Sequence, residues 1–174
     1  MSAPTLTTAR LTLSPPQLSD FDDSRAMWAD PVVVQHVGGR PFTDEESWTR
    51  LMRARGLWDV LGFGYWAVRE TSTGRYVGEV GFADLHRDLQ PSLKGLPEMG
   101  WVLAAWSHGQ GFGTEAVRAG LAWIDATLTP PIVPCIIDVE NAASIALAAK
   151  VGFRLREHAH YKGASIVVME RARP

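Results

Sequence analysis

The segment SHGQGFGTEA, residues 107–116, carries three glycines at alternate positions directly before a threonine and a glutamate. An apolar run typical of a strand precedes it, and a run with helical periodicity follows it. Because glycine has no side chain, the backbone N–H groups of such a turn can point into one concavity, with the positive end of the helix dipole behind them. A tight turn needs only one or two glycines, so the pattern favours an anion site, and nests of this kind bind phosphate.

The consensus sequences of two common phosphate-binding loops do not match this segment. A nucleotide-triphosphate loop carries Lys and then Ser or Thr after its last glycine, whereas Gly113 is followed by Thr114 and Glu115. The dinucleotide fingerprint requires G-x-G-x-x-G in an early strand–helix–strand unit, and GQGFG has a different spacing. The loop by itself therefore leaves the phosphate ligand open.

The elements that must position this loop follow from periodicity. Strand patterns cover residues 5–14, 64–70, 75–85, 97–106, 132–139, 153–161 and 164–171, and helical patterns cover 19–29, 43–62, 114–128 and 141–150. Thr43 with Glu46 forms a capping box, Asn141 is an N-cap residue, and Gly152 lies where a C-cap glycine is expected. This order predicts one domain, residues 1–174, of the α/β (α+β mixed) class with helices on both faces of a sheet.

Composition excludes several classes of protein. The 46% hydrophobic fraction, the 21% charged fraction and the net charge of −2, with no block of like charges, indicate an ordinary globular protein and no nucleic-acid partner. No apolar run reaches about 18 residues, so we expect no membrane partner. The lone Cys135 cannot form an internal disulfide, and the N-terminus does not have the pattern of a secretory signal, so we expect a cytoplasmic protein.

Taken together, the segments resemble the GNAT superfamily of acyl-CoA-dependent N-acetyltransferases, and within it the RimJ/RimL-like branch. The family's loop reads R/Q-x-x-G-x-G/A, and HGQGFG follows it except that His108 takes the first place. TARLTLSPPQLSD, EMGWVLAAWSHGQGFGTEA and ENAASIALAAKVGF match further segments of the branch in the right order. The resemblance implies a twisted, mostly antiparallel mixed sheet of about seven strands, whose splayed central pair binds acyl-CoA.

The resemblance also implies acetyl-CoA as the co-substrate. Backbone groups of Trp101, Val102 and Leu103 would pair with the pantetheine arm, the loop N–H groups would hold the pyrophosphate, and Asn141 would contact the cofactor in addition to capping its helix. The implied cofactor-binding residues are Trp101, Val102, Leu103, His108, Gly109, Gln110, Gly111, Phe112, Gly113, Thr114, Asn141 and Ser144.

The implied reaction is attack of a neutral primary amine on the thioester, which needs a proton acceptor because an alkyl amine is mostly protonated at pH 7. Glu98 is the first candidate, acting directly or through water; its alternatives are a solvated strand-end carboxylate or a charge that orients the substrate, with Glu79, Asp84 and His86 as lesser candidates for the base. The N–H of Leu103 would polarise the thioester carbonyl. Many members carry a tyrosine acid where this chain has Ala148, so Ser144, a water or plain solvation would serve the leaving thiolate.

The acceptor would be a protein N-terminus or a small amine. One wall of its pocket is expected from residues 26–62, and another from residues 86–97 with the strand end at 106. The expected pocket residues are Trp28, Trp58, Trp66, Glu79, His86 and Trp106, with Trp48 also on the first wall. A homodimer stays open, and the alternatives to an enzyme are a non-catalytic acyl-CoA sensor on the same fold and a phosphate binder unrelated to CoA.

We expect no metal in this protein. His158 and His160 share one strand face, but the sequence shows no third ligand for them. Cys135 is interpreted as a small core residue rather than a nucleophile.

Overall fold

The computed structural model describes residues 3–174. Its strands are β1 (Leu6–Thr7), β2 (Leu11–Ser14), β3 (Tyr65–Glu70), β4 (Tyr76–Ala83), β5 (Glu98–Leu103), β6 (Ile132–Asp138), β7 (Arg154–Tyr161) and β8 (Ala164–Ala172). Its helices are α1 (Phe21–Trp28), α2 (Pro31–Val34), α3 (Asp44–Leu61), α4 (Phe112–Thr127) and α5 (Ala142–Lys150), with 3-10 turns at Leu18–Asp20 and Ala105–Ser107. No helix in this part of the chain is long and apolar enough to cross a membrane.

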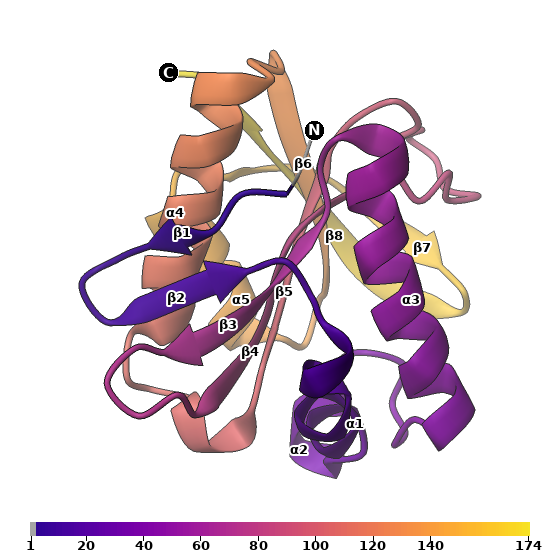
Figure 1. The fold of residues 1–174 in the computed structure, drawn as a ribbon. Coiled ribbons are helices and arrows are strands. Elements are labelled where there is room, and N and C mark those ends of the chain that lie inside the picture. Colours follow the sequence, from indigo (N-terminus) through magenta and orange to yellow (C-terminus); the bar gives the residue numbers. More distant parts are fainter. Residues whose placement is uncertain (1–2) are drawn as a thin grey trace.

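Two antiparallel sheets lie side by side at the centre of the molecule (Figure 1). Strands β1 to β5 pair in chain order, and the second sheet has the order β6-β8-β7. Strands β5 and β6 approach each other to within 8 Å between Cα atoms, but no ladder of hydrogen bonds joins them in the described residues. The predicted mixed fold is confirmed, and its open central pair is β5 and β6.

The N-terminal strand predicted over residues 5–14 is wrong in one respect, because it consists of two short strands. β1 and β2 form a hairpin that pairs Leu6 with Leu13, so residues 3–174 contain eight strands rather than about seven. Thr8 makes the turn: its hydroxyl oxygen accepts the N–H of Leu11 at 3.0 Å, and its own N–H donates to the Leu11 carbonyl at 2.9 Å. The turn contains neither glycine nor proline, so the apolar alternation of leucines hid it.

Helix α4 covers one face of the first sheet (Figure 1). Val117, Leu121 and Ile124 recur along its buried side, as the helical pattern predicted. They pack on sheet residues that share one hydrophobic cluster, including Trp66, Val80, Phe82 and Met99. A Cβ on Gly120 would lie 3.3 Å from the Met99 methyl carbon, so glycine there lets the helix lie close to β5.

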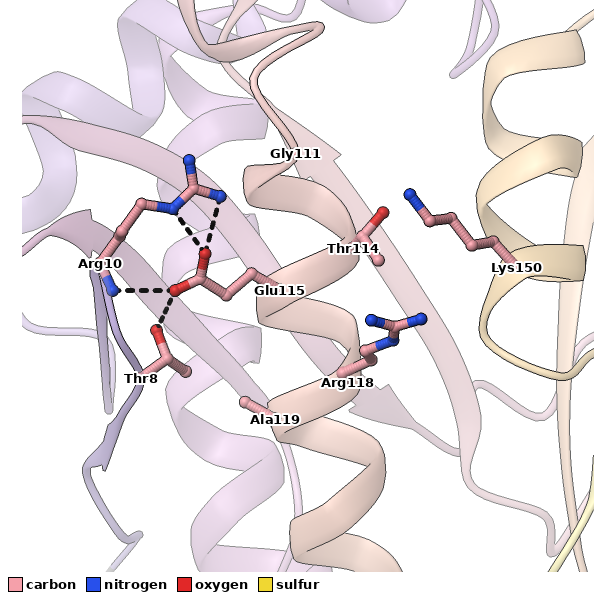
Figure 2. Close-up of a pocket in the computed structure, with 8 residues that line it drawn as sticks. All are labelled: Thr8, Arg10, Gly111, Thr114, Glu115, Arg118, Ala119 and Lys150. Carbon is pink, nitrogen blue, oxygen red and sulfur yellow. Dashed lines mark hydrogen bonds and ion pairs between the residues drawn. The ribbon is translucent and has the colours of Figure 1, made fainter.

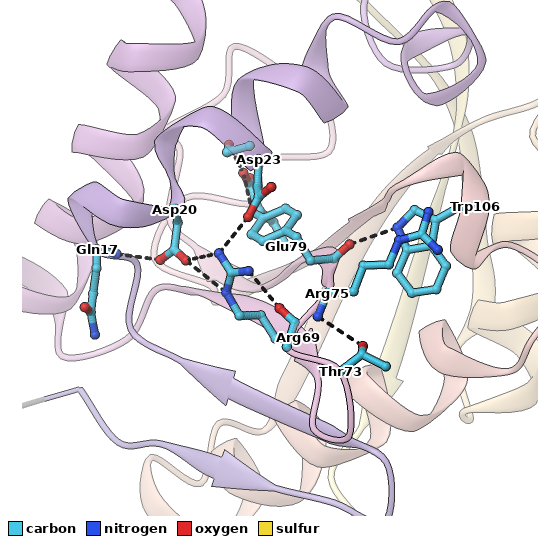
Figure 3. A network of polar contacts seen from close by, with 11 residues as sticks. Gln17, Asp20, Asp23, Arg69, Thr73, Arg75, Glu79 and Trp106 are labelled. Atoms are coloured by element: carbon cyan, nitrogen blue, oxygen red, sulfur yellow. Dashed lines mark hydrogen bonds and ion pairs between the residues drawn. The ribbon is translucent and has the colours of Figure 1, made fainter.

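Helices α1 and α2 cover the other face of the first sheet. Trp28 and Val34 are fully buried against Ala67 of β3 and Tyr76 of β4. Arg69 of β3 ties this layer to the sheet, since its Nη2 donates to Asp20 at 2.8 Å and to Asp23 at 2.9 Å (Figure 3). The helices on both faces therefore match the predicted layering.

Both predicted caps are confirmed by their hydrogen bonds. The Thr43 hydroxyl accepts the Glu46 N–H at 3.2 Å, and the Glu46 carboxylate accepts the Thr43 N–H at 2.8 Å. Asn141 Oδ1 accepts the Ser144 N–H at 3.0 Å at the start of α5. Gly152 lies two residues after the last residue of this helix, where its φ of +99° suits glycine and closes a Schellman motif.

Candidate functional site

The glycine loop, residues 108–113, needs its three glycines for two different reasons. Gly109 and Gly111 have φ of +74° and +80°, a left-handed conformation that costs other residues about 1 kcal/mol or more. Gly113 lies inside the first turn of α4, where a Cβ would lie 2.9 Å from methyl carbons of both Leu103 and Leu147. The first two glycines therefore shape the loop, and the third lets α4 approach β5 and α5.

The start of α4 presents free backbone donors. Its first helical hydrogen bond runs from the Glu115 N–H to the Gly111 carbonyl at 3.1 Å. The N–H groups of Phe112, Gly113 and Thr114 therefore have no partner inside the helix, as is usual for the first turn. They lie at the positive end of the helix dipole, which favours an anion.

A cleft of about 500 Å³ opens beside this helix start. It is lined by Thr8, Arg10, Gly111, Thr114, Glu115, Arg118, Ala119 and Lys150. Thr114 and Arg118 of α4 face Lys150 of α5 across the cleft (Figure 2). Two cations beside unsatisfied N–H groups make this part of the surface suited to a phosphorylated ligand.

Strand β5 turns part of its backbone toward the gap in front of β6. The Ala104 N–H donates to the Val77 carbonyl of β4 at 2.9 Å, and backbone groups alternate in direction along an antiparallel strand. The N–H of Val102 therefore also faces β4, whereas those of Trp101 and Leu103 face the gap. Of the three predicted cofactor-pairing residues, Trp101 and Leu103 are thus the two whose N–H groups point to the open side.

His108 does not face the helix start. Its Nε2 lies 2.9 Å from the Leu103 carbonyl oxygen, so the imidazole joins the first residue of the loop to the end of β5. No pattern in the sequence explained a histidine at this position. The structure shows that the side chain bridges the loop and the strand.

Ser144, Asn141 and Trp101 are connected by hydrogen bonds beside β5. The Trp101 indole N–H donates to the Ser144 hydroxyl oxygen at 3.2 Å, and the Ser144 N–H donates to Asn141. The indole also lies edge-on to Phe153, with ring centroids 6.5 Å apart. Because the Ser144 oxygen accepts from the indole, its own proton is free to donate toward the gap.

Glu98 lies on the opposite face of β5, together with Gly100 and Val102; we call this the acceptor face. Its side chain is buried, and its two oxygens accept from Arg87 Nε at 2.7 Å and Nη2 at 2.8 Å. Burial lowers the pKa of the Arg87 guanidinium, but the bonds and the charge of Glu98 outweigh it, so the net pKa is raised. Arg87 also stacks 4.9 Å from the ring centre of Tyr161. The sequence analysis named Glu98 but missed Arg87.

Glu79 is a second buried carboxylate, held by neutral donors. Its Oε1 accepts from Ser24 at 2.6 Å, the Trp28 indole at 3.1 Å and the Tyr76 hydroxyl at 3.3 Å. Burial, and next the charge of Glu79, raise the pKa of Tyr76 well above its ordinary value. Glu79 and Trp28 therefore bind α1 to the sheet, and Arg50 lies 3.6 Å above the Trp28 ring.

Tyr65 is a site residue that the sequence analysis missed. Tyr65 of β3, Gly81 of β4 and Gly100 of β5 lie in one row across the sheet. The tyrosine side chain spans this row, and a Cβ on Gly100 would overlap its hydroxyl oxygen. Burial, and next the charge of Glu98, raise the pKa of Tyr65 to about 12, so the phenol stays protonated at neutral pH. Two glycines in register across paired strands were the available signal.

Four other predicted pocket residues lie away from this face. Trp58 and Trp66 are core side chains, with ring centroids 4.8 Å apart. The Trp106 indole donates to the Tyr76 carbonyl at 3.0 Å (Figure 3). His86 is exposed and lies 3.4 Å from Asp84, which in turn accepts the Gly95 N–H and so holds the loop before β5.

Three potential metal ligands do come together elsewhere in residues 3–174. His36, Asp138 and Glu140 place ligand atoms within 4.8 Å of one another, and His36 Nδ1 lies 4.0 Å from Asp138. The group is partly exposed, and acidic groups of this kind are common without an ion. It therefore carries no assignment.

Comparison with known proteins accounts for this arrangement. The profile of the acetyltransferase (GNAT) domain family matches residues 10–154. A GnaT-family acetyltransferase from Bordetella pertussis is 31% identical, with a TM-score of 0.86 over 98% of this chain and 100% of that chain. The N-acetyltransferase p20 of Bacillus licheniformis is 27% identical over 169 residues, which cover 94% of this chain and 92% of the relative.

A more distant structure shares the fold. RimL, a ribosomal L7/L12 alpha-N-protein acetyltransferase solved with coenzyme A, is 14% identical, with a TM-score of 0.78 over 97% of this chain and 98% of that chain. At this identity the likeness concerns the fold alone. The family match, by contrast, spans most of the chain. The chain is therefore an acetyltransferase of the GNAT family, whose general activity is the transfer of an acetyl group from acetyl-CoA to an amine.

Proposed function

We propose that the chain transfers an acetyl group from acetyl-CoA to a primary amine by direct attack in a ternary complex. The proposal rests on the groups that lie together around β5. The free N–H groups of α4 and the backbone of Trp101 and Leu103 lie on the open edge, whereas Glu98 and Tyr65 lie on the acceptor face. A thioester at Leu103 would then be reached by an amine from the acceptor face.

The residues present fit acetyl-CoA as a co-substrate. The N–H groups of Phe112, Gly113 and Thr114 would hold the pyrophosphate, and Arg118 with Lys150 would meet the remaining phosphate across the 500 Å³ cleft. The co-substrate supplies an activated acetyl group as a thioester. The Leu103 N–H faces the gap and would polarise the thioester carbonyl as a single donor.

Glu98 is the proposed proton acceptor. Each of its oxygens holds one bond from Arg87, and a carboxylate oxygen has a second lone pair, so each can still accept from an amine or a bridging water. Arg87 holds both carboxylate oxygens in place and occupies one lone pair of each, which favours a water-relayed proton transfer over direct abstraction. Tyr65 keeps its proton at neutral pH, and its hydroxyl would orient the incoming nitrogen.

Ser144 is the proposed donor to the leaving thiolate. Its hydroxyl oxygen is occupied by the Trp101 indole, so its proton is directed by elimination toward other acceptors. Ala148 stands where many family members carry a tyrosine acid. A CoA thiol has an ordinary thiol pKa, so one hydroxyl and solvent suffice for this step.

The proposed acceptor is a primary amine, either on a small molecule or at a protein N-terminus. The RimL structure, an alpha-N-protein acetyltransferase, supports the second class through its fold alone. Assignment to the RimJ/RimL-like branch rests on the same likeness and on the sequence motifs quoted above.

The test is a thiol-release screen with acetyl-CoA and a panel of small amines and N-terminal peptides. We expect amine-dependent release of CoA that matches the yield of acetylated amine by mass spectrometry. Glu98→Gln should lower kcat by about 100-fold or more, as for loss of a general base. The proposal is wrong if acetyl-CoA binds but no amine in the panel supports release.

A non-catalytic acyl-CoA-binding module is the second candidate. Ala148 and the pairing of Glu98 with Arg87 favour it, because both remove groups that many enzymes of the family use freely. The same screen separates the two, since a sensor binds acetyl-CoA with no turnover and is indifferent to Glu98→Gln.

A further inference from the structure

Glu115 places a negative charge in the first turn of the helix that faces the expected phosphates. Acidic residues there stabilise a helix through its dipole. The same charge, however, would repel a pyrophosphate bound to the N–H groups of Phe112, Gly113 and Thr114 in the same turn. An acidic side chain at this position therefore needs a partner if the helix start is to hold an anion.

The turn between β1 and β2 supplies that partner. Glu115 Oε1 accepts from the Thr8 hydroxyl at 2.6 Å and from the Arg10 N–H at 2.9 Å. Glu115 Oε2 accepts from Arg10 Nε at 2.8 Å and lies 2.7 Å from Nη2 (Figure 2). Burial raises the pKa of Glu115, but these bonds outweigh it and the net pKa is lowered. The carboxylate is therefore ionised and its charge is matched by one guanidinium.

Arg10 also contacts the glycine loop directly. Its Nη1 donates to the Gln110 carbonyl at 3.0 Å, and its guanidinium lies 4.5 Å from the centre of the Phe112 ring. A Cβ on Gly111 would lie 3.4 Å from Nη2. One side chain from the N-terminal hairpin thus contacts Gln110 and Phe112, on both sides of Gly111, about one hundred positions later in the chain.

We propose that Arg10 is a positioning residue for the CoA pyrophosphate: it neutralises Glu115 and holds the glycine loop in its binding conformation. This inference rests on the proposed function, because it takes the pyrophosphate of CoA as the anion. Removal of Arg10 alone leaves an unpaired carboxylate beside the bound phosphates. Removal of both charges restores neutrality, although the contact with Gln110 stays lost.

The experiment is calorimetric titration of CoA into the purified protein and into Arg10→Gln, Glu115→Gln and the double variant. We expect Arg10→Gln to raise the Kd for CoA about tenfold and Glu115→Gln to change it by less than about threefold. The Kd of the double variant for CoA should be lower than that of Arg10→Gln by a factor of about three or more. The ratio of the Kd of Arg10→Gln to that of the wild type should fall at 0.5 M salt, because salt screens the charges.

Arg40→Gln is the matched control, because Arg40 forms a two-pronged pair with Glu46 on the exposed start of α3, outside the cleft. It should leave the Kd for CoA unchanged. Thermal unfolding of each CoA-free protein shows whether the variants are folded. If Arg10→Gln does not fold, Arg10→Lys keeps the charge, loses the fork geometry and should raise the Kd about threefold.

Equal Kd values for wild type and Arg10→Gln overturn the inference while CoA binding by the wild type still supports the proposed function. A double variant that binds no better than Arg10→Gln overturns the neutralising role. Absence of CoA binding by the folded wild type overturns the proposed function itself, and the inference with it.

Discussion

Two arginine–glutamate pairs lie at the two ends of the proposed site, and they differ in their surroundings. Arg87 and Glu98 are 19% and 7% exposed on the acceptor face, whereas Arg10 and Glu115 are 47% and 18% exposed beside the open cleft. In each pair the guanidinium makes two contacts shorter than 3 Å, which go to the two oxygens of Glu98 but to a single oxygen of Glu115. An arginine–glutamate pair therefore occurs once inside the protein, where Arg87 holds the Glu98 carboxylate, and once at the surface, where we propose that Arg10 and Glu115 affect CoA binding.

Because the two pairs differ in burial, they should differ in how much the free energy of unfolding falls when each pair is broken. A buried carboxylate that loses its partner cannot be rehydrated, so breaking a buried pair costs about 3–5 kcal/mol. An exposed pair contributes about 0–1 kcal/mol, because water replaces the lost partner. The buried pair should thus govern stability, and the exposed pair should govern CoA affinity.

Arg87→Leu should have the largest effect on stability. It leaves the Glu98 carboxylate buried without a cation, and we expect a loss of about 3–5 kcal/mol in the free energy of unfolding. Urea denaturation measures it. The double variant Arg87→Leu/Glu98→Leu should recover most of the loss, and a double variant as unstable as the single one would contradict the assignment to an orphaned charge.

Gly100→Ala should have an intermediate effect, confined to the acceptor face. The new methyl group would overlap the Tyr65 hydroxyl, so the ring must move, at a cost of about 1–3 kcal/mol. We expect a higher KM for the amine with an unchanged Kd for CoA. Gly56→Ala, on α3 where a Cβ meets nothing within 4 Å, is the control. Unchanged amine kinetics in Gly100→Ala would show that Tyr65 does not contact the acceptor.

Arg10→Gln should change stability little although it weakens CoA binding. We expect a loss of about 1 kcal/mol or less in urea denaturation, because half of the Arg10 side chain is already in water. A loss as large as that of Arg87→Leu would show that Arg10 is a structural residue like Arg87.

Loss of the exposed Arg40–Glu46 pair should have the smallest effect on the free energy of unfolding, and that effect should depend on pH. Hydrogen bonds from Arg40 and from the Thr43 backbone lower the pKa of Glu46 to about 2. Because this folded-state pKa lies below the unfolded value of about 4.3, its contribution is present above that value and is lost as the pH falls toward 2. Urea denaturation of wild type and Glu46→Gln should converge in that window. A difference that persists at pH 2 would contradict the shift.

Local signals in the sequence predicted most of the fold and the position of the glycine loop between a strand and a helix. The capping box at Thr43, the N-cap at Asn141 and the glycine loop each depend on neighbours within a few positions, and they lie as expected. The hairpin of β1 and β2 was missed because its turn lacks glycine and proline.

The acceptor face was harder to predict because its contacts depend on register between distant strands. Tyr65 reaches Gly100 only once β3, β4 and β5 are aligned. Arg87 meets Glu98 through a loop of irregular structure, and Arg10 meets Glu115 across one hundred and five positions. A single sequence contains each of these residues without the pairing that brings them together.

We propose that the two Arg–Glu pairs have different roles, with Glu98 serving the chemistry and Arg10 serving CoA binding. Steady-state kinetics of wild type, Glu98→Gln and Arg10→Gln, with the best amine from the thiol-release screen, test it directly. We predict that Glu98→Gln lowers kcat about 100-fold with an unchanged KM for acetyl-CoA, and that Arg10→Gln raises this KM about tenfold with kcat nearly unchanged. A Glu98→Gln variant with wild-type kcat, or an Arg10→Gln variant that loses kcat at an unchanged KM, would contradict it.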